Sequence, residues 1–261
     1  MDKVVSSAAE AVADIPDGAS LAVGGFGVCG IPSTLIRALV DQGARNLTVV
    51  SNNLGIDDMG LALLLTDHRI ERAICSYIGD NAEFARQYMA GELTLELTPQ
   101  GTLAERLRAG GAGVGAFFTP AGVGTWIADG GMPWRYAPDG TVALSSPPKE
   151  VRTFGGEEMV LEEGIATDYA IVRAQVADRH GNLRFHAAAR NFNPPCATAG
   201  RITIVEAERV VEPGELAADD VHLSGIYVQR VYQLTPEEAS YKPMELIATR
   251  PRPTTDTNEE A

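Results

Sequence analysis

The first 110 residues alternate between short apolar runs and longer stretches in which apolar residues recur every three or four positions. Short runs of this kind predict buried strands, whereas the wider spacing predicts helices with one apolar face. The predicted strands cover residues 21–23, 47–50, 73–77 and 93–97. The predicted helices cover residues 4–15, 33–42, 61–65, 82–89 and 103–108. Because strands that alternate with helices pair in parallel, the pattern predicts an open α/β sheet with helices on both faces.

The pattern changes after residue 120, where glycines and prolines crowd residues 122–133. Asp139-Gly140 lies between two short apolar runs and predicts the turn of a β-hairpin. Further short runs predict strands at residues 159–161, 169–174, 183–185, 202–205 and 226–231. We therefore predict one α/β domain over residues 1–234, an open, mostly parallel sheet flanked by helices with a β-rich C-terminal extension. Residues 235–261 are rich in Pro, Glu, Thr and Arg, which predicts a flexible tail.

Charge and cysteine content exclude several classes of protein. The 261 residues include 35 acidic and 21 basic side chains, and the net charge of −14 repels nucleic acids and anionic membranes. No run is apolar over the ~18 residues that a membrane helix needs, and the N-terminus lacks the pattern of a secretion signal. The three cysteines are widely spaced without a CxxC pair, which argues against disulfides and structural zinc. We expect a cytoplasmic protein with no metal, nucleic-acid partner or membrane association.

A glycine-rich loop, Gly24 to Gly30, joins a predicted strand to a predicted helix. It contains the G-x-G-x-x-G pattern of dinucleotide-binding turns, which also requires an Asp or Glu about 20 residues later to bind a ribose. The next strand ends instead in the neutral residues Ser51-Asn52-Asn53, which weakens the dinucleotide interpretation. A glycine loop before a helix also presents backbone N–H groups to anions or oxyanions. We favour such a ligand loop over glycines that only permit tight turns.

Several segments resemble the class I coenzyme A transferases, and within that family the α subunits of the enzymes that act on 3-oxoacids. The longest of them, residues 17–32, contains the glycine loop and is similar to the first signature of the family. The shorter matching motifs are residues 51–53, 81–84, 97–106, 110–113 and 189–193. The resemblance implies the fold of these transferases for most of the chain.

The resemblance also implies a ping-pong reaction that moves CoA between succinyl-CoA and a 3-oxoacid such as acetoacetate. In the family, a glutamate carboxylate attacks the acyl-CoA thioester, passes through an acyl anhydride and becomes a glutamyl-CoA thioester. That glutamate lies in a Ser-Glu-Asn-Gly motif on the β subunit, whereas this sequence lacks the motif. The chain is therefore expected to be half of an α2β2 enzyme, with acyl-CoA and short carboxylic acids as substrates and no cofactor.

Candidate site residues follow from the same resemblance. Attack on a thioester builds negative charge on the carbonyl oxygen, and a neutral amide can donate a hydrogen bond to it. Asn52 or Asn53 is expected to provide this donor, the alternative being a turn in which both side chains bond the local backbone. Gln100 is expected to bind the acid, the alternative being a helix cap. The residues expected to bind CoA or substrate are Gly24, Gly25, Phe26, Gly27, Val28, Cys29, Gly30 and Gln100.

A purely structural role is the alternative for Phe26, Cys29 and Arg190. Phe26 either walls the acyl pocket or packs against the following helix, and Cys29 is more often a small packing residue than a reactive thiol. Arg190 pairs with a substrate anion or, as its position favours, forms an interface or structural ion pair. His186 has no recognisable partners for a metal. His186-Ala187-Ala188 also stands where the family commonly has basic residues, so these positions offer no lysine for a CoA phosphate or a partner subunit.

Three alternatives are compatible with the sequence, one of which is a stand-alone homo-oligomer that has lost its partner. The acid can be 3-oxoadipate or acetate, because nothing in the motifs reports on the acid pocket. The fold also resembles sugar-phosphate-sensing domains of some transcriptional regulators, although no DNA-binding helix-turn-helix precedes it and the charge is −14. A neighbouring reading frame that encodes Ser-Glu-Asn-Gly would favour the transferase.

Overall fold

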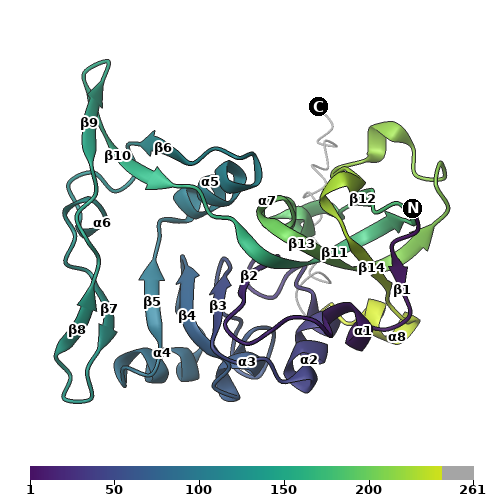
Figure 1. The fold of residues 1–261 in the computed structure, drawn as a ribbon, viewed down its shortest axis with the longest axis horizontal. Helices are drawn as coiled ribbons and strands as arrows, with labels where there is room; N and C mark the ends of the chain where they lie inside the picture. Colours follow the sequence, from purple (N-terminus) through teal and green to yellow (C-terminus); the bar gives the residue numbers. More distant parts are fainter. Residues whose placement is uncertain (243–261) are drawn as a thin grey trace, which may run out of the picture.

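The computed structural model describes residues 1–242, and its centre is a nine-stranded sheet (Figure 1). Eight strands follow one another in the order β1-β14-β13-β11-β2-β3-β4-β5, and every neighbouring pair is parallel. The ninth, β12, pairs antiparallel with β11. The strands of this sheet are β1 (Val4–Val5), β2 (Ser20–Val23), β3 (Leu47–Val50), β4 (Ile70–Cys75), β5 (Thr94–Leu97), β11 (Thr167–Asp178), β12 (Leu183–Arg184), β13 (Gly200–Val211) and β14 (Arg230–Gln233).

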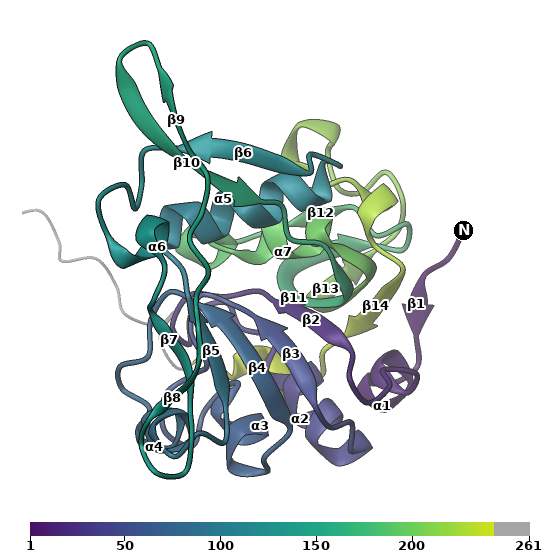
Figure 2. The same ribbon diagram turned by 60° about the vertical axis from the view of Figure 1, so that its left-hand side comes forward.

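Helices cover both faces of the sheet, as the alternating pattern predicts (Figure 2). Successive strand residues point to opposite faces, so Leu21 and Val23 pack in one core while Ala22 packs in the other. The first core lies under α1 (Ala8–Val12), α2 (Ser33–Gln42), α3 (Ala62–Thr66) and α4 (Ala82–Met89). The second lies under α5 (Gln100–Gly111) and α7 (Asn193–Ala199). The predicted fold class is confirmed.

The order of the strands creates a switch point between β2 and β11. From β2 the chain adds β3, β4 and β5 in one direction, and it later returns to place β11 on the other side of β2. In open α/β sheets, ligands bind outside the carboxyl ends of the strands at such a point. The glycine loop follows β2 directly, so the fold places it at this edge.

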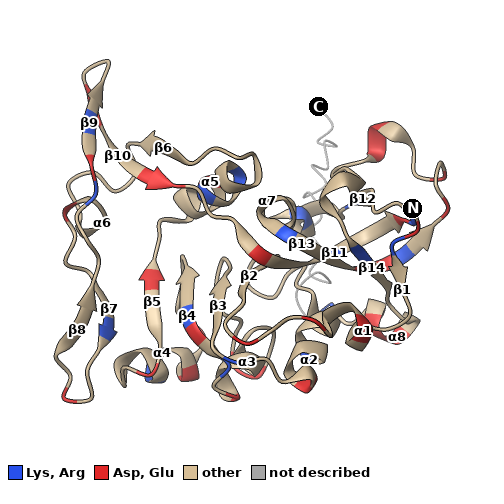
Figure 3. Cartoon of the chain, in the orientation of Figure 1, with Lys and Arg blue, Asp and Glu red and all other residues tan. Residues whose placement is uncertain are grey.

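Two smaller sheets lie beyond β5, at the left of Figure 1. The first comprises β6 (Ala116–Thr119), β9 (Val151–Phe154) and β10 (Glu157–Glu163). The second is the hairpin of β7 (Pro133–Tyr136) and β8 (Val142–Ser145) around Asp139-Gly140. Along the chain, α6 (Trp126–Asp129) lies between β6 and β7. A buried ion pair joins the three-stranded sheet to the main body, because the Glu162 carboxylate on β10 lies 3.8 Å from Arg106 Nε on α5. Glu162 also lies 2.6 Å from Nζ of Lys149, in the segment between β8 and β9. Arg106 also pairs with Glu96, the acidic residue of β5, a strand that carries one red stretch in Figure 3. The predicted hairpin is confirmed.

Three predicted elements differ from the structure. The helix predicted for residues 4–15 is wrong at its start, because Val4 and Val5 pair with β14 and Ser7 then caps α1. The strand predicted at residues 226–231 is partly a 3-10 turn before β14, η3 (Gly225–Tyr227). The predicted tail begins with a helix, α8 (Pro236–Ser240), whose N-terminus is capped by Thr235 and Glu238 in a capping box. The rest of that tail, residues 243–261, lies outside the described residues.

The described chain also contains two short 3-10 turns, η1 (Ala187–Arg190) and η2 (Ala218–Asp220). Within residues 1–242, no helix has both the length and the apolar character that crossing a bilayer requires.

Candidate active site

A pocket of about 1020 Å³ lies at the carboxyl ends of β2, β3, β4 and β5. The segment that follows each of these strands contributes side chains to the pocket. The lining residues are Phe26, Gly27, Val28 and Cys29 after β2, Asn52, Asn53, Ile56 and Asp57 after β3, Ser76, Tyr77 and Asp80 after β4, and Gln100 after β5. The sequence-predicted residues Gly24, Gly25 and Gly30 are buried beside this lining and shape the loop instead.

The glycine loop has a backbone that only some residues can follow. Gly25, Gly27 and Gly30 have φ values of +112°, +61° and +66°, where side chains with a Cβ are strained. Phe26 and Cys29 exchange two N–H···O bonds of 3.0 Å, which reverse the chain at the pocket. Within the described part of the chain, the N–H groups of Gly25 and Val28 have no hydrogen-bond partner. Of these two residues Val28 lines the pocket, so its N–H is a donor placed for a ligand oxygen.

Asn52 holds two walls of the pocket together. Its Oδ1 accepts a hydrogen bond from the Gly27 N–H at 3.1 Å, and its Nδ2 donates to Gln100 Oε1 at 2.9 Å. Pro99, not Gln100, is the N-cap residue of α5, so the capping alternative for Gln100 is wrong. The local turn alternative is also wrong for Asn52, because its partners are 25 and 48 residues away. The amide of Asn52 is thus committed to the pocket's own structure.

Asn53 and Ser76 provide polar groups that the protein itself leaves unused. Asn53 lines the pocket, is only 5% exposed, and its side chain makes no hydrogen bond to any described residue. The Ser76 hydroxyl, also from a lining residue, is covered and likewise lacks a partner within residues 1–242. A covered hydroxyl without a hydrogen bond, such as that of Ser76, costs about 1–3 kcal/mol. These groups are therefore well placed to bond a ligand's oxygen atoms.

The charges at the pocket are negative or absent. β2 and β3 carry no Lys, Arg, Asp or Glu (Figure 3), and the charged residues that line the pocket are Asp57 and Asp80. Among residues 1–242, no Lys, Arg, His or Glu lines it. Burial raises the pKa of the neighbouring Cys75 thiol to about 12, so Cys75 stays protonated and is a poor nucleophile. The pocket has hydrogen-bond donors for an oxyanion, and its two carboxylates already accept hydrogen bonds from the surrounding loops, Asp57 from the Ala82 N–H and Asp80 from the Tyr77 hydroxyl.

Two asparagines hold the glycine loop from the far side of the switch point. Asn191 Nδ2 donates to Cys29 O at 3.1 Å, and the fully buried Asn193 donates through Nδ2 to Gly30 O at 2.9 Å. Asn193 Oδ1 accepts from the N–H of Arg173 on β11 at 3.0 Å. A Cβ on Gly24 would lie 2.0 Å from that Oδ1, so this position requires glycine. In the sequence, residues 189–193 were recognisable only by their family resemblance, because their contacts with the glycine loop span more than 160 residues.

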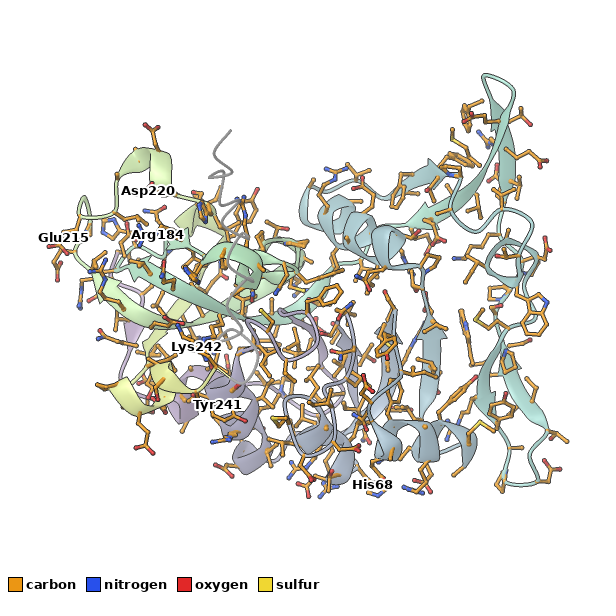
Figure 4. The ribbon with its side chains drawn as sticks, turned by 180° about the vertical axis from the view of Figure 1, so that it is seen from behind. His68, Arg184, Glu215, Asp220, Tyr241 and Lys242 are labelled. Atoms are coloured by element: carbon orange, nitrogen blue, oxygen red, sulfur yellow. The ribbon has the colours of Figure 1, made fainter. Side chains whose placement is uncertain are left out.

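A buried glutamate supports the helix that follows the glycine loop. Glu206 Oε2 accepts from the N–H groups of Thr34 and Leu35, in the first turn of α2, at 2.9 and 3.0 Å. Its Oε1 lies 3.4 Å from Arg173 Nη1, and Arg173 also bonds Glu208 and the backbone oxygens of Ala239 and Tyr241. Tyr241 and Lys242, labelled in Figure 4, lie where α8 meets this network. Burial raises the pKa of Glu206 to about 7 against the opposing effect of Arg173.

This raised pKa predicts how stability depends on pH. Because the folded pKa lies above the unfolded value of 4.5, Glu206 contributes most stability below pH 4.5, and that contribution is lost as pH rises through 7. We expect the difference in unfolding free energy between wild type and Glu206→Gln to fall by about 3 kcal/mol over this interval. Urea unfolding of both proteins at several pH values measures it. Parallel pH curves for the two proteins would contradict the prediction.

The remaining predicted residues are less central. Phe26 is 47% exposed at the pocket, with its ring centroid 6.4 Å from that of Phe192. Cys29 lines the pocket, whereas Arg190 and His186 are on or next to η1 and outside the lining. No group of three or more His, Cys, Asp or Glu side chains suited to a metal occurs in residues 1–242. Ser76 and Tyr77 were not predicted as site residues, because the apolar pattern extends the strand to Tyr77, whereas in the structure β4 ends at Cys75.

Comparison with known proteins decides the family. A family model described as Coenzyme A transferase matches residues 5–234. The chain belongs to the coenzyme A transferase family. One relative is a Mycobacterium tuberculosis protein named as the A subunit of a probable succinyl-CoA:3-ketoacid coenzyme A transferase. It is 64% identical to this transferase chain over 231 residues, which cover 88% of the chain and 93% of that protein. A human protein named "Succinyl-CoA:3-ketoacid coenzyme A transferase 2, mitochondrial" is 52% identical over 88% of the chain but only 44% of its own length.

Solved structures support the same assignment. The acyl-CoA transferase YdiF of Escherichia coli O157:H7, in a thioester complex with CoA, superposes with a TM-score of 0.74 at 26% identity. The match covers 90% of this transferase chain and 47% of that protein. This chain thus corresponds to about half of both YdiF and the human transferase. The predicted family resemblance is confirmed.

Proposed function

We propose that this chain is the α subunit of an enzyme that moves CoA between succinyl-CoA and a 3-oxoacid such as acetoacetate. The names of its relatives support this activity, and the match to half of the longer transferases supports the need for a partner chain. The observation that carries the proposal is the pocket at the switch point, which combines unused hydrogen-bond donors with the absence of a lining glutamate among the described residues. Such a pocket suits one half of a divided active site.

Asn53 is the proposed oxyanion donor, in preference to Asn52. The Asn52 amide already donates to Gln100, whereas the Asn53 amide has no partner in the described chain. When a carboxylate attacks the thioester carbonyl carbon, the carbonyl oxygen becomes negative, and a donor already in place stabilises it without reorganisation. The unbonded Val28 N–H is a second donor at the same pocket. Together they would bind the thioester oxygen.

The attacking carboxylate is proposed to be a glutamate of the β subunit. Its oxygen would bond to the acyl carbon, the carbon–sulfur bond would break, and CoA thiolate would leave an acyl anhydride. The thiolate would then attack the glutamyl carbonyl carbon, releasing the acid and leaving a glutamyl-CoA thioester. The second acid reverses these steps, so CoA is transferred with no cofactor and no net proton change. Uncharged donors suit this reaction, because a nearby cation would pair with the carboxylate nucleophile and lower its reactivity.

The proposal includes an α2β2 assembly and a cytoplasmic location. The location follows from the cysteine pattern, since Cys29, Cys75 and Cys196 form no disulfide. 3-Oxoadipate and acetate are the alternative acids, and measuring CoA transfer to each acid separates them.

Activity is expected only when this chain is combined with a β subunit. The chain is purified alone and after co-expression with a β subunit that carries Ser-Glu-Asn-Gly, and CoA transfer from succinyl-CoA to acetoacetate, 3-oxoadipate and acetate is measured. We expect no turnover by the chain alone and the highest kcat/KM with acetoacetate for the pair. Equal turnover by the isolated chain would contradict the divided site, and a preference for another acid would replace acetoacetate.

A further inference from the structure

Tyr77 lines the pocket two strands away from the glycine loop, because β3 separates β4 from β2. It is the second residue after β4, lines the pocket and remains 49% exposed. Phe26, the other half-exposed aromatic residue of the lining, follows β2. Between β2 and β4 lies β3, and Asn53 is the third residue after it. Because adjacent strands are about 4.8 Å apart, the ends of β2 and β4 are about 10 Å apart, and the proposed oxyanion donor follows the strand between them.

The ring of Tyr77 is fixed against its own loop. A Cβ on Gly79 would lie 2.3 Å from the Tyr77 hydroxyl oxygen and 2.5 Å from Cζ, so the ring lies directly over this glycine. The hydroxyl donates to Asp80 Oδ2 at 3.3 Å, and Asp80 itself has a φ of +60°. The Tyr77 hydroxyl thus bonds Asp80, which is another lining residue, and the half-exposed side chain borders the pocket.

The loop behind Tyr77 is tied to its neighbours. Asp80 O accepts from the Asp57 N–H at 3.1 Å, and Asp57 Oδ1 accepts from the Ala82 N–H at 2.8 Å, at the start of α4. Asn81 caps α4 and donates to Leu54 O at 2.9 Å. These bonds join the loops after β3 and β4, so the segment that carries Tyr77 is tied to the neighbouring wall of the pocket.

We propose that Tyr77 is a specificity-determining residue that limits the length of the acid that the pocket accepts. The inference rests on the proposed function, since it assigns the acid to this pocket. An acid whose carboxylate reaches the donors at the end of β3 extends its carbon chain toward one of the two aromatic walls. On the β4 side, the ring of Tyr77 contacts a short chain and blocks a longer one. Removing the ring should therefore favour longer acids at the expense of short ones.

The test compares two acids of equal charge, acetoacetate and 3-oxohexanoate, which differ by two methylene groups. The wild-type pair of subunits and its Tyr77→Ala variant are assayed for CoA transfer from succinyl-CoA to each acid. We expect the ratio of kcat/KM for 3-oxohexanoate to that for acetoacetate to rise at least ~10-fold in Tyr77→Ala, since each methylene in an apolar pocket changes discrimination by about 10-fold or more. An unchanged ratio would overturn the proposal.

Matched variants separate the ring from other effects. Tyr77→Phe keeps the ring and loses only the hydroxyl bond to Asp80, so its ratio should stay within about threefold of wild type. Tyr227→Ala removes a tyrosine outside the pocket lining and should leave the ratio unchanged. If Tyr77→Ala does not fold, Tyr77→Leu replaces it, with an intermediate rise expected and a constant ratio again counting against the proposal.

Failure of this inference is distinguishable from failure of the proposed function. If the wild-type pair does not transfer CoA to acetoacetate, the proposed substrate is wrong. The ratio is then measured between the acid that the wild-type pair uses and the acid two carbons longer. A constant ratio with an active wild type refutes the role of Tyr77 alone.

Discussion

Replacing Asn53 by alanine is expected to lower kcat of the assembled enzyme by about 10²–10³-fold, which is the usual cost of losing one oxyanion donor. KM should change little, because the hydrogen bond strengthens only as the carbonyl oxygen becomes negative. Stability should stay within about 1 kcal/mol of wild type, because the Asn53 side chain bonds no other described residue. Steady-state kinetics and urea unfolding of the same preparations measure both effects.

Asn52→Ala is the matched control for this prediction. It removes two hydrogen bonds, from Gly27 and to Gln100, and should cost about 1–3 kcal/mol of stability. Asn53→Ala should therefore impair catalysis without unfolding, whereas Asn52→Ala should impair stability as well. A fully active Asn53→Ala enzyme would remove Asn53 from the oxyanion site.

The second large effect is expected from Gly30→Ala, which should lower the free energy of unfolding by about 3–5 kcal/mol. Gly30 has a φ of +66°, which costs a residue with a Cβ about 1–2 kcal/mol. A Cβ there would also lie 2.6 Å from Ala189 O, a backbone atom that cannot move aside cheaply. The shift would break the hydrogen bond from Asn193 to Gly30 O and release the glycine loop from α7.

Gly27→Ala separates these two contributions. Its φ of +61° is nearly the same, but a Cβ at Gly27 has no neighbour within 4 Å. Only the cost of the backbone conformation, about 1–2 kcal/mol, is expected for it. The two variants are compared by urea unfolding at one protein concentration, because binding of a partner shifts apparent stability. Equal losses for Gly27→Ala and Gly30→Ala would show that the contact with Ala189 is unimportant.

The sheet was predictable where its strands are short, apolar and buried on both faces, as β2 and β3 are. Residues 21–23 and 47–50 lie in an apolar layer between two sets of helices, so every side chain along them is apolar or small. The N-terminal Val4-Val5 pair misled the pattern, since two residues are too few to separate strand from helix. Its pairing with β14 depends on residues more than 220 positions away, which no local pattern reports.

The site was predictable where the chain changes direction at a strand end. Gly24 to Gly30, Asn52, Asn53 and Gln100 all follow strands that the pattern located, and seven of the predicted residues line one pocket. The division of labour between Asn52 and Asn53 was not predictable, because adjacent asparagines differ only in which way each side chain points in the fold. Tyr77 was missed because an aromatic residue beside an apolar run is usually part of the strand.

The most direct test of a divided active site is to find the chain that carries the covalent intermediate. The assembled enzyme is incubated with succinyl-CoA in the absence of a second acid, treated with borohydride to reduce the glutamyl-CoA thioester, and both chains are analysed by intact-mass and peptide mass spectrometry. We expect a modified glutamate in the β subunit, with no modified residue in the chain described here. A modified glutamate in this chain would contradict the divided site.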